Sequence, residues 1–340
     1  MPIRIGIMGF GQIGRNIFRL LYPDDTIEIV AIVDIADPRG LEYLLKFDTV
    51  HGRFDEPVWV KGEAMYVKGR QIRMLNRKAP GDVDWGAMGV DVVVEATTKF
   101  RTREQLQAHL DMGAKRVVLT VPPRSPQDVD ALIVTGVNDH TLTPDTRIVS
   151  NASCTANAVA PICMLLDESF GIVQGYLTTV HAYTNDQRLA DVPHSDLRRS
   201  RAAAENIIPT STWAAQAVEQ ILPQLRGKLD GMAMCVPVPD GSVVDLVTVM
   251  SRAVTAEEVN EVVRSAAATR LRDVIEYTDE PVVSSDVVGN THSALFDASS
   301  TFVLGDTMLK TLTFYDNGWG YAKRVVELIP RLASFDRVAA

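Results

Sequence analysis

Cysteine, clustered positive charge and long apolar runs are all scarce in this sequence, and each scarcity argues against a class of protein. Only three of the 340 residues are cysteine, at Cys154, Cys163 and Cys235. A low, odd count favours a reducing compartment over a disulfide framework, and the spacing lacks the paired Cys and His ligands of a zinc site. The net charge is −9 and no basic run stands out, so neither nucleic acid nor an anionic membrane surface is expected as the main partner.

No apolar stretch is long enough to span a bilayer, and the N-terminus leads directly into a strand pattern rather than a signal-type segment. We therefore expect a cytoplasmic protein without a bound metal. The hydrophobic content of 46% over 340 residues is enough for two sizeable domains.

A glycine-rich loop follows the first apolar strand, which is expected over residues 3–8. The loop has the pattern G-x-G-x-x-G, and helical periodicity follows it over residues 15–21; its residues are Gly9, Phe10, Gly11, Gln12, Ile13 and Gly14. A second strand over 27–33 ends in Asp34, about twenty positions past the last glycine, where a ribose-binding carboxylate belongs. A structural glycine turn is the alternative. The full order of elements favours a dinucleotide site, and Asp34 favours NAD over NADP because it would repel a 2′-phosphate.

Further alternation of strands and helices predicts a parallel, Rossmann-type sheet. Strands are expected over 90–95, 116–120 and 131–136, a helix over 103–112, and an antiparallel insertion between 46 and 77. Ligands bind at the carboxyl ends of strands in such sheets, so Thr97 and Thr120 join the cofactor-binding candidates.

Cys154 lies in the polar stretch 150–157, between an apolar strand ending at 149 and a helical pattern from 158. Unpaired backbone N–H groups and the positive end of the helix dipole would favour a reactive thiolate there. A buried structural cysteine is the alternative, but the small polar neighbours do not resemble a core.

A strand over 175–180 leads to His181, which could take the thiol proton of Cys154. A polar loop and several arginines follow. These read as anion-binding groups, with a solvated surface loop as the alternative. From 231 on, strand patterns predict a mostly antiparallel sheet. We therefore predict an NAD-binding domain over 1–152, joined by a C-terminal helix over 320–340, and an α+β catalytic domain over 153–319.

A thiolate beside a nicotinamide cofactor suggests oxidation of an aldehyde through a thioester, with water or phosphate releasing the acyl group. The motifs together resemble the phosphorylating glyceraldehyde-3-phosphate dehydrogenase family, and more loosely the erythrose-4-phosphate dehydrogenases. The resemblance runs nearly end to end and is carried by residues 9–15, 46–54, 150–157, 181–187, 196–199 and 315–321.

This resemblance implies Cys154 as nucleophile, His181 as base, Asn317 as the group that holds the nicotinamide carboxamide, and Asp34 as the adenosine-ribose ligand. It implies a substrate phosphate at Thr184. The residues matching the site for attacking phosphate are Ser153, Thr155, Arg199 and Thr212. It also implies a homotetramer with a glycolytic role, in which residues 183–208 reach towards a neighbour's cofactor.

Several positions depart from the family's pattern. Cys235 stands where the family has its substrate-phosphate arginine, and Trp213 replaces a glycine next to Thr212. Thr98 also replaces a glycine, Gln12 an arginine and Gly318 a glutamate. The loss of a guanidinium removes charge-assisted hydrogen bonds of about 1.5–3 kcal/mol each, and an indole would narrow the phosphate region.

Three functions stay open at this point. The chain is an ordinary glyceraldehyde-3-phosphate dehydrogenase, or a dehydrogenase of erythrose 4-phosphate or another aldehyde with a pocket shaped by Trp213 and Cys235, or an NAD-binding regulatory protein without catalysis. The intact set of Cys154, His181 and Asn317 argues against the last.

Overall fold

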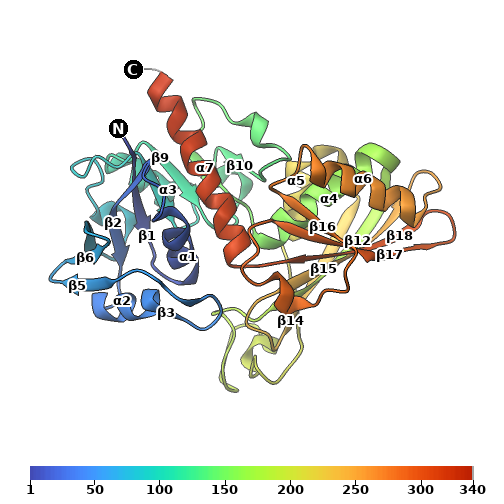
Figure 1. Ribbon diagram of the computed structural model, residues 1–340, viewed down its shortest axis with the longest axis horizontal. Helices are drawn as coiled ribbons and strands as arrows, with labels where there is room; N and C mark the ends of the chain where they lie inside the picture. The colour runs from blue at the N-terminus through green and yellow to red at the C-terminus, as the bar shows by residue number, and fades with distance from the viewer. Residues whose placement is uncertain (339–340) are drawn as a thin grey trace. The chain divides into compact units, whose positions relative to one another are not determined.

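The structure is a computed structural model, and it describes residues 1–338. Contacts divide the chain into two compact units. Unit 1 comprises Met1–Ile133, His140–Ala152 and the residues from Ala322 on, and unit 2 comprises Val134–Asp139 and Ser153–Tyr321. The ribbon in Figure 1 is coloured along the chain so that the segments of each unit can be followed.

A nine-stranded sheet forms the centre of unit 1. Its strand order is β10-β11-β9-β8-β1-β2-β7-β6-β5. The strands are β1 (Ile3–Met8), β2 (Ile27–Asp34), β5 (Val58–Lys61), β6 (Ala64–Val67), β7 (Arg70–Asn76), β8 (Val92–Glu95), β9 (Arg116–Leu119), β10 (Ala131–Leu132) and β11 (Ile148–Ser150). The pairs from β10 to β7 are parallel, and β6 and β5 continue the sheet antiparallel. A separate two-stranded ribbon joins β3 (Phe47–Asp48) and β4 (Gly52–Arg53).

The inner strands of this sheet are buried on both faces, and their sequences are rich in valine and isoleucine. Every residue of β8 and β9 is buried, and so are nearly all of β1 and β2. Continuous apolar strands are typical of parallel sheets that are covered on both sides. The predicted Rossmann-type sheet and its antiparallel insertion are thereby confirmed.

One predicted strand is too long. The strand expected over 131–136 ends at Leu132, and Gly136 has a φ of +81°. A Cβ at Gly136 would lie 2.8 Å from Cδ2 of Leu271. The chain therefore leaves the sheet here and packs with unit 2 over Val134–Asp139.

The helices of unit 1 are α1 (Gln12–Leu21), α2 (Pro38–Lys46), α3 (Arg103–Asp111) and the part of α7 (Trp319–Val338) from Ala322 on. Arg116 of β9 anchors α7, because its guanidinium donates to both carboxylate oxygens of Asp336 at 2.8 and 2.7 Å and lies over the ring of Phe335. The predicted helix over 320–340 includes two residues, 339 and 340, that lie outside the described part of the chain.

Unit 2 is built on a seven-stranded sheet in the order β13-β14-β12-β15-β18-β17-β16. Its strands are β12 (Ile172–Ala182), β13 (Ile208–Ser211), β14 (Leu229–Val236), β15 (Ser242–Met250), β16 (Ile275–Thr278), β17 (Ala294–Leu304) and β18 (Met308–Tyr315). Four of the six strand pairs are antiparallel, while β12–β14 and β16–β17 are parallel. The expected mostly antiparallel second sheet is confirmed.

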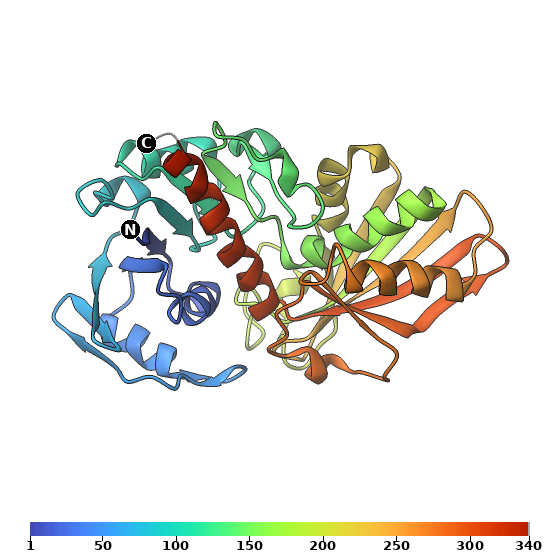
Figure 2. The same ribbon diagram turned by 45° about the horizontal axis from the view of Figure 1, so that its top comes forward.

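Three helices cover one face of this sheet: α4 (Cys154–Phe170), α5 (Ala214–Ile221) and α6 (Ala256–Ala268). Figure 2 shows them on the same side of the strands. Along β15, buried and half-buried residues alternate strictly, which is typical of a sheet with one covered face. No helix among residues 1–338 is long and apolar enough to cross a membrane.

Candidate active site

The glycine loop of unit 1 meets the steric demands of a dinucleotide site. Gly9 has a φ of +93°, and a Cβ there would lie 2.6 Å from the carbonyl carbon of Ala96. A Cβ at Gly14 would lie 2.1 Å from the carbonyl oxygen of Gly9, whereas a Cβ at Gly11 would meet nothing within 4 Å. Gly11 also begins α1 without a side-chain cap. Open space therefore faces uncapped N–H groups at a helix start, which suits a pyrophosphate.

Asp34 is held against this loop. One carboxylate oxygen accepts from the backbone N–H of Phe10 at 2.7 Å, and the other accepts from that of Ala36 at 2.9 Å. The Phe10 ring is fully buried and packs edge-on against Phe18 at 5.6 Å. Of the predicted cofactor residues, Phe10 has its ring in the core, its N–H bonded to Asp34 and its carbonyl bonded to Arg15. Gln12 and Ile13 lie half-buried in the first turn of α1.

Thr97 and Thr120 lie at the carboxyl ends of neighbouring strands, as predicted. The N–H of Thr97 donates to the Glu95 side chain at 2.8 Å, and the Thr120 hydroxyl donates to the Glu95 carbonyl at 3.1 Å. Thr98 has a φ of +65°, the left-handed conformation that glycine adopts without cost. A glycine at position 98, as in the family that the sequence resembles, would adopt this conformation without strain.

Cys154 and His181 lie together in unit 2. Cys154 is the first residue of α4, whose N-cap is Ser153, and the Ser153 hydroxyl accepts from the N–H of Ala156 at 3.1 Å. The Cys154 sulfur lies 3.5 Å from Nε2 of His181. Nδ1 of His181 donates to the carbonyl oxygen of Ala182 at 2.6 Å. In the neutral imidazole, Nε2 therefore presents a lone pair to the thiol.

Burial acts on the pKa values of both members of this pair. It raises the pKa of Cys154 to about 11, and hydrogen bonds from Thr155 oppose this only in part. Burial also lowers the pKa of His181, against the hydrogen bond to Ala182. Burial therefore favours the uncharged forms, a thiol facing a neutral imidazole, and the neutral imidazole is the form that can accept the thiol proton.

Tyr315 connects the helix and the strand that carry this pair, a role that the sequence alone did not indicate. Its hydroxyl lies 2.8 Å from the hydroxyls of both Thr155 and Thr179. Its ring stands edge-on to His181 at 6.1 Å. The signal was the alternation in β18, which directs Tyr315 to the helix-covered face. Thr155, a predicted phosphate ligand, consequently turns its hydroxyl inward.

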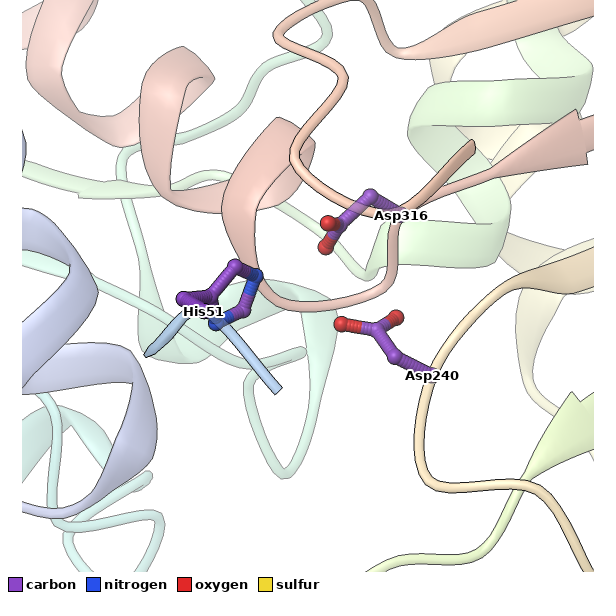
Figure 3. Close-up of side chains that lie close together, drawn as sticks. All are labelled: His51, Asp240 and Asp316. Carbon is purple, nitrogen blue, oxygen red and sulfur yellow. The ribbon is translucent and has the colours of Figure 1, made fainter. Parts of the chain in front are cut away.

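Asn317 follows Tyr315 in a loop held by two buried carboxylates, Asp240 and Asp316, which Figure 3 labels. The Asn317 N–H donates to Asp240 at 3.1 Å, and its side-chain oxygen accepts from the Ser242 hydroxyl at 2.8 Å. Asp316 accepts from the N–H groups of Gly289 at 2.7 Å and Gly318 at 2.8 Å. Asp240 and Ser242 were also missed, because only the fold brings their turn to Asn317.

Two of the predicted anion-binding residues, Arg199 and Thr184, lie in one local group with Asp186. The Arg199 guanidinium donates to the Thr210 hydroxyl from Nε at 3.1 Å and from a terminal nitrogen at 2.8 Å, and it pairs with Asp186. Asp186 also accepts from the Thr184 hydroxyl. Arg199 and Asp186 both influence the pKa of Cys235, which burial raises. Cys235 is paired in register with His181, so both side chains face the helices.

Two other predicted residues lie at the start of α5. The Thr212 hydroxyl accepts from the N–H of Ala214 at 3.2 Å, and Trp213 is the half-buried N-cap residue. The hydroxyls of Ser153 and Thr212 thus both accept from backbone N–H groups at the start of a helix. An anion bound there would accept from the same hydroxyls.

Comparison with known proteins agrees with both units. Residues 3–103 match the NAD binding domain of glyceraldehyde 3-phosphate dehydrogenase, and residues 153–317 match its C-terminal domain. A glyceraldehyde-3-phosphate dehydrogenase of Geobacillus stearothermophilus is 49% identical over 335 residues, which cover 98% of this chain and 99% of that protein. Glyceraldehyde-3-phosphate dehydrogenase 2 of Bacillus subtilis is 47% identical, with 98% of both chains covered. A Mycobacterium bovis relative is 47% identical, over 97% of this chain and 98% of its own. The chain belongs to the glyceraldehyde-3-phosphate dehydrogenase family.

Proposed function

We propose that this chain oxidises glyceraldehyde 3-phosphate with NAD and inorganic phosphate. The observation that carries the proposal is the pairing of the Cys154 sulfur with Nε2 of His181 at 3.5 Å, at the start of a helix in a chain of this family. NAD supplies the hydride acceptor when it is bound. The residues described above supply the nucleophile, the base and the anion-binding groups.

The chemistry follows from the protonation states of the pair. His181 takes the thiol proton as the sulfur bonds to the aldehyde carbon, and the proton passes to the carbonyl oxygen to give a hemithioacetal on Cys154. When the carbon gives up its hydride, His181 removes the hydroxyl proton, and a thioester remains. Phosphate then adds to the thioester carbon, the carbon–sulfur bond breaks, and the sulfur regains a proton.

For the cofactor we propose Asp34, Thr97, Thr120 and the loop from Gly9 to Gly14 in unit 1. Asn317 of unit 2 would hold the nicotinamide carboxamide. The support is local: open space at Gly11, a carboxylate fixed at the loop, and an amide held in a defined orientation. Residues 1–152 with the C-terminal segment 320–340 would then serve as the NAD domain, and residues 153–319 as the catalytic domain.

For the two phosphate groups we propose Thr184 as a ligand of the substrate phosphate. The attacking phosphate would be bound by Ser153, Thr155, Arg199 and Thr212. Arg199 is paired with Asp186, so an incoming dianion would have to replace that carboxylate. Such exchange is plausible at a half-exposed ion pair, which contributes little to stability.

A second candidate is the oxidation of a different aldehyde by the same chemistry, such as erythrose 4-phosphate or a less charged substrate. The observation in its favour is Cys235, which lies beside His181 in register and has no charge to offer a phosphate. Trp213 at the start of α5 also favours a different aldehyde, because its indole would narrow the phosphate region. The third candidate function, that of an NAD-binding regulatory protein without catalysis, would not require the Cys154–His181 pair.

A panel of phosphorylated and unphosphorylated aldehydes, each assayed with and without inorganic phosphate, tests the proposal. We expect the highest kcat/KM for glyceraldehyde 3-phosphate, strict dependence on phosphate, and no turnover by Cys154→Ser. A preference for an uncharged aldehyde, or release of free acid without phosphate, would replace the first candidate with the second. Absence of turnover with every aldehyde would favour the regulatory protein.

We also propose a homotetramer in the cytoplasm. One face of the sheet in unit 2 points away from the helices, and we call it the outer face. It carries partly exposed apolar side chains, those of Tyr176, Val180, Met234, Val243 and Val247. The segment 183–208 adds Leu189, 86% exposed, and Leu197, 82% exposed. A second copy of the chain would cover such surfaces. The three cysteines are free thiols, which suits a reducing compartment.

A further inference from the structure

Ser242 lies in unit 2 between Ala182 and Asn317, and it takes no part in the reaction steps proposed above. It is the first residue of β15, its exposed fraction is 0%, and it follows the turn at Asp240 and Gly241. Gly241 has a φ of +84°, and a Cβ there would lie 2.0 Å from the carbonyl oxygen of Ser284. The turn that presents Ser242 therefore has little freedom to move.

The hydroxyl of Ser242 joins two groups of the proposed site. It accepts from the backbone N–H of Ala182 at 3.0 Å and donates to the side-chain oxygen of Asn317 at 2.8 Å. The N–H of Ala182 can only donate, so the hydroxyl accepts from it, and the hydroxyl proton is directed at the Asn317 oxygen. The Tyr315 hydroxyl is a further hydrogen-bond partner of Ser242. The carbonyl of the same Ala182 fixes Nδ1 of His181.

Asn317 is thereby held at two points by one turn. Asp240 accepts from its backbone N–H at 3.1 Å, and Ser242 occupies its side-chain oxygen. With that oxygen engaged, the NH₂ group of the side chain remains to donate to a ligand. The two ends of an asparagine amide have nearly the same shape, so the hydrogen-bond partner decides which end a ligand meets.

We propose that Ser242 is a positioning residue that sets the amide orientation of Asn317, so that its NH₂ group meets the carbonyl of the cofactor's carboxamide. This inference rests on the proposed role of Asn317. Through Ala182, Ser242 also links the residue that orients the nicotinamide to the strand end that orients the base. One buried hydroxyl thus connects the residue that orients the hydride acceptor, Asn317, with the backbone that orients the base, His181.

Ser242→Ala removes the hydroxyl and frees the Asn317 amide to turn over. We expect the KM for NAD to rise about tenfold, which corresponds to about 1.4 kcal/mol. The more specific readout uses an NAD analogue with an acetyl group in place of the carboxamide. A reversed amide can still bond to the NH₂ of a carboxamide, but it offers the acetyl group no donor. The kcat/KM ratio of NAD to the analogue should therefore increase several-fold in Ser242→Ala.

Three further variants make the result decisive. Ser242→Thr retains the hydroxyl and should restore the wild-type ratio. Ser293→Ala removes another buried serine hydroxyl, one with no hydrogen-bond partner within residues 1–338, and should leave the ratio unchanged. Thermal melting of each variant verifies folding. If Ser242→Ala is folded and its ratio equals that of the wild type, the proposal is overturned.

Asn317→Ala separates this proposal from the one on which it rests. If Asn317→Ala leaves the KM for NAD unchanged, the role of Asn317 is wrong and the inference falls with it. If Asn317→Ala raises the KM but Ser242→Ala alters neither KM nor ratio, only the inference fails. If both act, the double variant should resemble Asn317→Ala alone, since Ser242 works through Asn317.

Discussion

Cys154 is subject to two opposing effects at one atom. The start of α4 and the hydrogen bonds from Thr155 favour a negative sulfur, whereas burial disfavours it and holds the pKa at about 11. His181 lies close enough to accept the proton, yet burial lowers its own pKa. Neither group is charged readily alone, so the proton should move when the aldehyde arrives.

Alkylation by iodoacetamide measures this balance, because the thiolate is the reactive form. In protein free of NAD, labelling of Cys154 should accelerate steadily from pH 7 towards about 11, since a pKa raised by burial delays deprotonation. Peptide mass spectrometry locates the label, and His181→Asn serves as the comparison. A rate that levels off below pH 8 in the wild type would show that His181 already holds the proton at rest.

Cys235 tests which aldehyde the site prefers. Cys235→Arg places a guanidinium near Asp186 and Arg199, because the charges of these two residues act on the pKa of the Cys235 thiol. The KM for glyceraldehyde 3-phosphate should fall by about tenfold, the effect of one charge-assisted hydrogen bond. Steady-state kinetics provide the measurement.

Cys235→Met is the control for this substitution, because it adds length without charge and should not lower the KM. Position 235 is buried, so circular dichroism of both variants must first show native folding. Equal KM values in the wild type and a folded Cys235→Arg variant would remove position 235 from the account of phosphate binding.

Residue types and strand ends were enough to predict Cys154, His181 and Asp34. Asp34 and His181 stand at the carboxyl ends of strands, and Cys154 follows one closely. Each also has a side chain that can bind a ribose or take part in catalysis. Tyr315, Thr179 and Ser242 were not predictable in the same way. Hydroxyl residues are common, and only the register of β12, β15 and β18 shows that these three face one another.

At the scale of elements, a buried chain of hydrogen bonds joins α3 to the end of β8. The indole N–H of Trp85 donates to Nδ1 of His109 at 3.1 Å, so Nε2 of His109 carries the proton and donates to Glu95 at 3.1 Å. Glu95 in turn accepts from the N–H of Thr97. All three side chains that precede Thr97 are 0% exposed. The chain thus fixes the loop at which Thr97 would meet the cofactor.

Trp85→Phe removes the first donor in this chain and leaves Nδ1 of His109 buried without a partner. The free energy of unfolding should fall by about 1–3 kcal/mol, as measured by urea denaturation. Trp59→Phe is the matched control, because Trp59 is 46% exposed and its substitution should cost less than about 0.5 kcal/mol. Equal losses in the two variants would show that the indole N–H of Trp85 contributes nothing specific.

Most elements of unit 1 were predictable because each carries its own pattern of apolar residues. The exception at 131–136 has a non-local cause. Leu271 and Val274, distant in sequence, pack where a Cβ of Gly136 would stand and hold the chain in a turn. The order of the strands was likewise not predictable, since β7 pairs with β2 although four strands, β3 to β6, lie between them in the chain.

At the scale of the whole molecule, the outer face predicts how copies of the chain assemble. Val247 lies on β15 between Tyr176 and Lys310, away from the helices. Val247→Asp should shift the proposed tetramer towards smaller species, because it places a charge in an apolar interface. Sedimentation velocity measures the effect. Glu257→Lys, on the exposed side of α6, should sediment as the wild type, and a Val247→Asp variant that remains fully tetrameric would place the interface elsewhere.

The alternation of β12 has a genetic consequence. Leu177, Thr179 and His181 face the helices, while Tyr176, Thr178 and Val180 face the opposite way. Inserting one codon upstream of these residues would exchange the two sets and damage catalysis and assembly together, whereas inserting two would restore the facing. Natural or engineered length variation in this strand should therefore be tolerated, if at all, only in even steps.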